Sequence, residues 1–112
     1  MSNNRKNARV PLDIYLNKYV GGVPYMAHAA DISQEGLSLG RLIEPERSSQ
    51  RVGLQFQLPG SEEVIYAEGE VVREWVEASP RTPDRSGVRF TLLTERHRRM
   101  IDDYVARGSE GH

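Results

Sequence analysis

The chain has 112 residues, of which 38% are hydrophobic and 28% are charged, a composition that suits one soluble globular domain with a modest core. The absence of cysteine excludes disulfide bonds and thiolate metal sites, and it fits a reducing cytoplasm. A net charge of −1 argues against a domain built to bind nucleic acid. No apolar run approaches the roughly 20 residues of a membrane-spanning helix, and no apolar signal segment follows Met1. We therefore expect a cytoplasmic protein without membrane insertion.

The first nine residues are predicted to form a flexible basic arm. Arg5, Lys6 and Arg9 stand in this segment without any acidic residue. The guanidinium group of arginine can donate two parallel hydrogen bonds to a phosphate group or to O6 and N7 of guanine. Taken alone, such an arm is more often a solvated basic segment, so it indicates a binding site only together with a second polar motif.

Most of the chain that follows alternates apolar and polar residues, which predicts half-buried strands. The clearest alternation runs from Val52 to Leu58, and turn residues stand at Gly21-Gly22 and Pro59-Gly60. Val71-Val72 breaks the phase of its strand and predicts a β-bulge or burial on both faces. The predicted strands cover residues 10–16, 23–32, 37–39, 52–58, 64–76 and 88–92, with polar loops at 41–51 and 77–86.

A closing helix is predicted after Thr94, a suitable N-cap residue followed by an acidic first turn. Its apolar face comprises Met100, Ile101, Tyr104 and Val105. We expect the helix to end near Arg107, with Gly108 as its C-terminal cap and residues 108–112 as a frayed tail. Six short strands followed by one helix predict an all-β fold: an antiparallel barrel, spanning residues 10–107 with its capping helix.

A second polar motif follows the predicted second strand. Asp31, Ser33 and Gly36 place a carboxylate and a hydroxyl two residues apart, ahead of a glycine. In an extended chain Asp31 and Ser33 point to the same side. An ionised carboxylate only accepts hydrogen bonds, so it suits the ring N–H and amino group of guanine. By itself this pattern is more often a turn at a strand end.

The two motifs together resemble the signature of the PilZ domain family, RxxxR followed by (D/N)xSxxG. The match consists of Arg5 with Arg9, then Asp31, Ser33 and Gly36, in the expected order. Similarity to the family extends over nearly the whole chain, including Val10-Pro11-Leu12, Gly87-Val88-Arg89-Phe90 and the closing helix.

This resemblance implies a PilZ-like six-stranded barrel that binds the bacterial second messenger cyclic di-GMP and has no catalytic activity or cofactor. It implies that Arg5 and Arg9 take guanine edges and phosphates, and that Asp31 and Ser33 take guanine donors or hold the arginines. Gly36 would allow a turn or a close backbone approach. The signal would pass to an unidentified protein effector. Further candidate contacts are Lys6, Arg73, Trp75 and Arg89.

Two other readings remain open at this point. One is a ligand-independent PilZ scaffold that binds another protein, although such members usually lose one of the motifs. The other is a small barrel that binds single-stranded nucleic acid, which would need more aromatic residues than the 7% present. An extra arginine before RxxxR accompanies two bound ligands in the family, and Asn4 at that position leaves the stoichiometry open.

Gly36-Leu37-Ser38-Leu39-Gly40 fits the G-x-S-x-G pattern of serine hydrolases. That motif needs a strand–turn–helix in a larger α/β scaffold, whereas the flanking residues here predict a strand. His28, His97 and His112 lack the spacing of metal ligands. The sequence thus contains no catalytic constellation.

Overall fold

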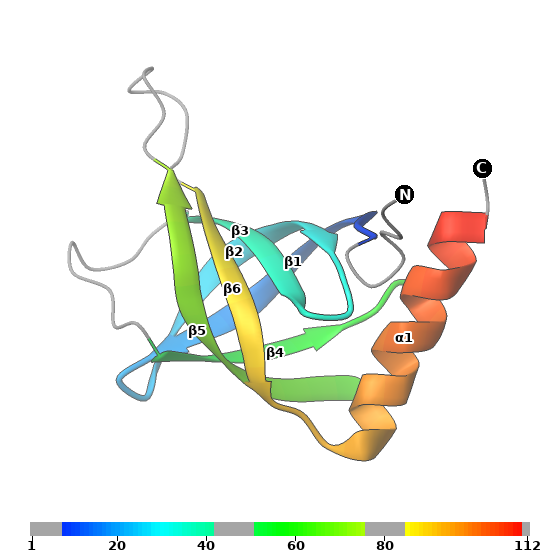
Figure 1. Cartoon of the computed structure of the whole chain (residues 1–112). Coiled ribbons are helices and arrows are strands. Elements are labelled where there is room, and N and C mark those ends of the chain that lie inside the picture. Colours follow the sequence, from blue (N-terminus) through cyan, green and yellow to red (C-terminus); the bar gives the residue numbers. More distant parts are fainter. Residues whose placement is uncertain (1–7, 42–50, 76–84, 111–112) are drawn as a thin grey trace.

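The structure is a computed structural model that describes residues 8–41, 51–75 and 85–110. Its elements form a closed barrel of six antiparallel strands with one helix at its side, as predicted (Figure 1). Around the barrel the strands follow the order β1-β2-β3-β6-β5-β4. The elements are β1 (Val10–Val20), β2 (Val23–Ile32), β3 (Gly36–Arg41), β4 (Arg51–Gln57), β5 (Val64–Trp75), β6 (Arg85–Leu92) and α1 (Glu95–Glu110).

Alternation along the strands fills the barrel with apolar side chains. In β4 and the residue after it, all four apolar positions that the pattern singles out are buried. The strand β3 alternates in the same way, because Leu37 and Leu39 are buried while Ser38 between them is only partly covered. Ser38 therefore lies on a strand, as predicted, and not on the strand–turn–helix that a nucleophile elbow requires.

Register shifts between β5 and β6 explain where the alternation fails. The shifts fall between Val71 and Arg73 and between Glu68 and Gly69, so the predicted irregularity in the long strand is confirmed. The second shift sets two residues of β6 against one of β5 and turns Leu92 outward. Leu92 is consequently exposed, although its phase with Val88 and Phe90 predicts a buried side chain.

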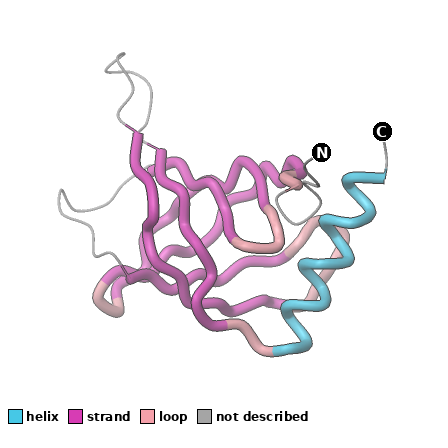
Figure 2. The backbone as a smooth tube through the Cα atoms, viewed as in Figure 1, coloured by secondary structure: helices cyan, strands magenta, loops and turns pink. Residues whose placement is uncertain are grey.

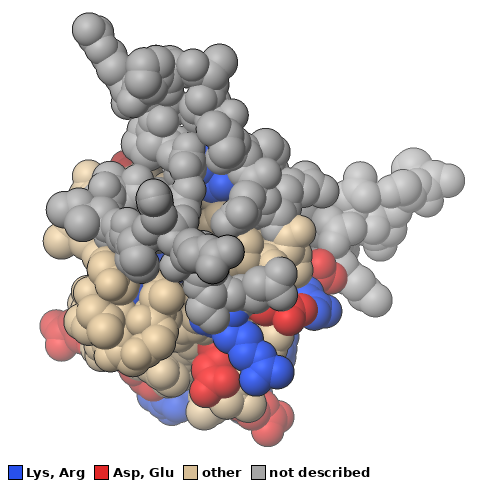
Figure 3. Space-filling view, turned by 90° about the vertical axis from the view of Figure 1, so that its left-hand side faces the viewer, with Lys and Arg blue, Asp and Glu red and all other residues tan. Residues whose placement is uncertain are grey.

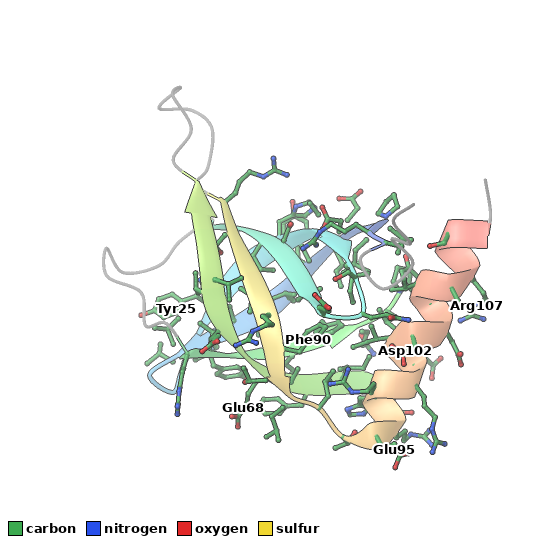
Figure 4. The ribbon with its side chains drawn as sticks, viewed as in Figure 1. Tyr25, Glu68, Phe90, Glu95, Asp102 and Arg107 are labelled. Atoms are coloured by element: carbon green, nitrogen blue, oxygen red, sulfur yellow. The ribbon has the colours of Figure 1, made fainter. Side chains whose placement is uncertain are left out.

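The helix α1 begins as predicted, with the Thr94 hydroxyl accepting the backbone N–H of His97 at 3.2 Å. Ile101 and Val105 are buried against the barrel, and Figure 4 shows Glu95 and Arg107 near the two ends of the helix. The helix continues to Glu110, beyond the predicted end near Arg107.

Gly108 lies within α1 and does not cap it. A Cβ atom at this position would lie 2.8 Å from a methyl group of Val10, so the glycine lets the last turns of the helix approach the start of β1. The Tyr104 hydroxyl donates to the Pro11 carbonyl at 3.1 Å in the same region. Figure 2 shows the course of the backbone, with α1 running beside one end of the strands. None of the described helices has the length and apolarity needed to cross a bilayer.

Candidate functional site

An ion pair joins the two motifs on the outer surface of the barrel. The Arg9 guanidinium donates through Nη1 to Asp31 Oδ1 at 2.7 Å, across 22 residues of sequence. The backbone brings them together, because Pro11, two residues after Arg9, pairs with Asp31 in the β1–β2 register. The side chains are 48% and 29% exposed, so both are accessible to a ligand from solvent.

A β-bulge turns Asp31 toward the outside. Ala29 and Ile32 are fully buried, and strict alternation from Ala29 would point Asp31 into the core. The β2–β3 register shifts between Ala29 and Asp31, which places the carboxylate on the outer face opposite Ser38. Bulges of this kind are common where a strand must re-aim a functional side chain.

Ser33 holds the turn that follows β2. Its side chain is buried, and its hydroxyl accepts the backbone N–H groups of Glu35 at 3.1 Å and Gly36 at 3.2 Å. The expectation that Asp31 and Ser33 share one side of a strand does not hold, because β2 ends at Ile32 and Ser33 belongs to the turn. Its hydroxyl shapes the loop next to Asp31.

Gly36 is required by the neighbouring strand. A Cβ atom on Gly36 would lie 1.9 Å from the Val88 carbonyl oxygen, which is a severe overlap with backbone. The Glu35 carbonyl accepts the Phe90 N–H at 2.8 Å and joins the same turn to β6. Of the two reasons anticipated for this glycine, the structure supports close backbone approach.

Of the remaining candidate residues, the structure describes the side chain of Arg89 only. Arg89 pairs in register with Gly36 on the outer face, and its guanidinium forms an ion pair with Glu70 of β5. Arg73 and Trp75 belong to β5, but their side chains lie outside the described part of the structure. Arg5 and Lys6 fall outside the described residues altogether. The structure thus brings Arg9 to Asp31, and Ser33 and Arg89 to Gly36.

Two polar clusters were not anticipated from the sequence. His28 Nε2 lies 2.6 Å from Asp13 Oδ1 on the outer face of β1 and β2. Glu63, before β5, binds Arg96 of α1 through both carboxylate oxygens, at 2.6 and 2.7 Å, and contacts His97 Nε2 at 3.1 Å. Each histidine is paired with a carboxylate that lies far away in the sequence, Asp13 for His28 and Glu63 for His97. Residue spacing in the sequence therefore does not predict either cluster.

The Glu63 cluster fastens the start of the helix to the barrel. Hydrogen bonding and charge from Arg96, together with His97, lower the pKa of Glu63 from 4.5 to about 2. Burial opposes this shift, and the same contact raises the pKa of Arg96. Among the described residues, no group of three or more His, Cys, Asp or Glu side chains is arranged to hold a metal ion.

The fold is a small closed β-barrel that carries the Arg9–Asp31 ion pair on its outer face. The chain matches the PilZ domain over residues 3–107 and belongs to this family. No curated protein matches its sequence.

Solved structures confirm the fold. The inhibitor of motility MotI/DgrA from Bacillus subtilis matches with a TM-score of 0.71 and 16% identity, over 92% of this chain and 51% of that one. PlzA from Borreliella burgdorferi, solved in complex with c-di-GMP, matches with a TM-score of 0.57 and 14% identity, over 94% of this chain and 38% of PlzA. This chain therefore spans about half of MotI/DgrA and less of PlzA.

Proposed function

We propose that this protein is a non-enzymatic receptor for cyclic di-GMP that transmits the signal to a protein partner. The observation that carries the proposal is the Arg9–Asp31 ion pair, which unites the two family motifs on an accessible surface. PlzA, which shares the fold, was solved with this nucleotide.

The chemistry of the pair suits a guanine nucleotide. A guanidinium carries five N–H donors, and the contact with Asp31 uses one of them, leaving others for phosphate oxygens or for O6 and N7 of guanine. The Asp31 carboxylate accepts from the guanine N1–H and amino group. Arg5 would add a second guanidinium group to the site when the arm closes over the ligand.

Charge on the barrel disfavours the nucleic-acid alternative. On the face shown in Figure 3, Lys and Arg side chains lie next to Asp and Glu side chains, without a continuous basic field among the described residues. A single-stranded nucleic acid is usually bound along a basic groove with exposed aromatic rings. Among the described residues visible on this face, the mixed charges do not form the extended basic groove that this alternative requires.

Calorimetric titration with cyclic di-GMP tests the proposal. We expect saturable binding to the wild type and a loss of about tenfold or more in affinity for both Arg9→Ala and Asp31→Ala. Removal of a charged hydrogen-bond partner costs roughly 1.5–3 kcal/mol, which corresponds to this change.

The exposed Arg99–Glu95 pair of α1, with an N–O distance of 2.9 Å, provides a matched control. Arg99→Ala and Glu95→Ala remove the same charges far from the motifs in sequence, and they should leave the affinity unchanged. Absence of binding to the wild type would overturn the receptor proposal in favour of a ligand-independent scaffold. Equal affinity of wild type and Arg9→Ala would exclude the site.

A further inference from the structure

A second polar group lies on the outer face of β2, one bulge away from Asp31. Ala27 and Ala29 point into the core, so His28 between them faces outward on the same side as Asp31. Its Nε2 contacts Asp13 Oδ1 at 2.6 Å, and its ring meets that of Tyr15 edge-on, with centroids 5.2 Å apart. Neither family motif includes these residues.

The backbone at Asp13 is held in an unusual conformation. Its φ is 53°, in the left-handed region, and the β1–β2 register shifts between Pro11 and Ile14 around it. Aspartate tolerates this region better than most residues, although glycine would occupy it with less strain. The side chain is 87% exposed, so it is not needed in the core, yet it orients the imidazole.

On the β3 side, the described surface beside Asp31 and His28 carries no bulky side chain. Asp31 pairs with Ser38 of β3, and His28 pairs with Gly40. With Gly36, these outward positions of β3 carry nothing longer than a hydroxymethyl group. Asp31 lies three residue steps beyond His28 along β2, which corresponds to about 10 Å in an extended chain. A ligand with one base held at Asp31 can therefore extend along β2 until it reaches the imidazole of His28.

We propose that His28 is a specificity-determining residue that contacts a second guanine of the ligand, with Asp13 and Tyr15 as positioning residues. This inference rests on the proposed cyclic di-GMP binding. An ionised carboxylate only accepts hydrogen bonds, so Nε2 carries the proton donated to Asp13, and in the singly protonated ring Nδ1 is the acceptor. Guanine offers N1–H and its 2-amino group to such an acceptor. In the same base orientation, adenine presents its N1 acceptor and no 2-amino group to Nδ1, and its 6-amino donor lies where guanine has O6.

The cyclic dinucleotide with one guanine and one adenine tests this assignment directly. Its guanine can occupy the Asp31 subsite, which leaves adenine at His28. We expect the wild type to bind cyclic di-GMP about tenfold more tightly than the hybrid, because one neutral hydrogen bond contributes about fivefold and two equivalent guanines add a statistical factor of about two.

His28→Phe keeps an aromatic ring against Tyr15 and removes the acceptor. We expect it to lower the affinity for cyclic di-GMP and to reduce the preference over the hybrid to the statistical factor of about two. Asp13→Gly suits the positive φ at that position and removes the partner of the imidazole. It should lower the same preference without lowering the thermal midpoint, which separates orientation of the ring from stabilisation of the fold.

The outcomes distinguish this inference from the proposed function. If Asp31→Ala loses binding while His28→Phe retains the wild-type preference, the receptor proposal stands and the role of His28 is refuted. A wild type that binds the two dinucleotides equally would also refute it. A wild type that binds neither would overturn both proposals.

Discussion

At Gly36, side-chain size and not backbone conformation decides which residue is tolerated. The left-handed φ values among the described glycines occur at Gly21, Gly22 and Gly60, and open space surrounds each of them. The φ of Gly36 lies outside the left-handed region, but Gly36 touches the backbone of β6. The last position of the motif therefore closes the barrel beside the site, and Ser33 shapes the turn that leads to it.

We predict that Gly36→Ala lowers the free energy of unfolding by about 3 kcal/mol, because the added methyl group forces β3 and β6 apart. Urea denaturation measures the change. Gly60→Ala is the matched control: its φ of 83° should cost about 1 kcal/mol although nothing obstructs the methyl group. Equal losses in the two variants would contradict the role assigned to close approach.

At the scale of elements, alternation predicts the strands where one face is buried and the register is uninterrupted. It succeeds throughout β4, where every inward position is apolar. It fails at Leu92 and cannot orient Asp31, because a bulge depends on pairing with a distant strand and leaves no local periodic signal.

The motif residues of the candidate site were predictable only through their family register. The pairing of Arg9 with Asp31 follows from the fold, in which β1 lies beside β2. His28 with Asp13 was beyond sequence reasoning, because the pair requires a register shift and a left-handed aspartate. The helix end was misplaced because Gly108 serves packing against Val10, which no helix-ending rule describes.

The attachment of α1 should depend on pH through Glu63. Its folded-state pKa of about 2 lies below the ordinary 4.5, so the stabilisation is fully present above about pH 4.5 and is lost as pH falls toward 2. We predict that the stability difference between wild type and Glu63→Gln shrinks over this interval. Chemical denaturation at a series of pH values measures it.

Glu62→Gln provides the control, since it removes the same charge from the adjacent, exposed position. The free energy of unfolding of Glu62→Gln should differ little from that of the wild type at any pH in this range. If the difference in free energy of unfolding between wild type and Glu63→Gln stays constant from pH 5 to pH 2, the contact with Arg96 and His97 does not stabilise the attachment of the helix.

At the scale of the whole molecule, the start of β1 links the candidate site to α1. Arg9 precedes Val10 and Pro11, which contact Gly108 and Tyr104 of the helix. Val10, Pro11, Tyr104 and Gly108 also line a groove of about 690 Å³ between α1 and the turn after β4. If the proposed ligand engages Arg9, it would act on a segment whose next two residues touch the helix, and this part of the surface is where the proposed partner would sense occupancy.

We predict that cyclic di-GMP stabilises the whole domain and protects the arm in particular. A ligand at 100 times its dissociation constant adds about 2.7 kcal/mol to the free energy of unfolding, which raises the midpoint of a domain of this size by roughly 10 °C. Differential scanning calorimetry measures the shift, and Asp31→Ala at the same ligand concentration should show little of it. Hydrogen exchange should then show added protection at residues 2–9 beyond the uniform gain expected from global stabilisation. A shift without added protection there would mean that the ligand is held by the barrel alone, and that the arm does not close over it.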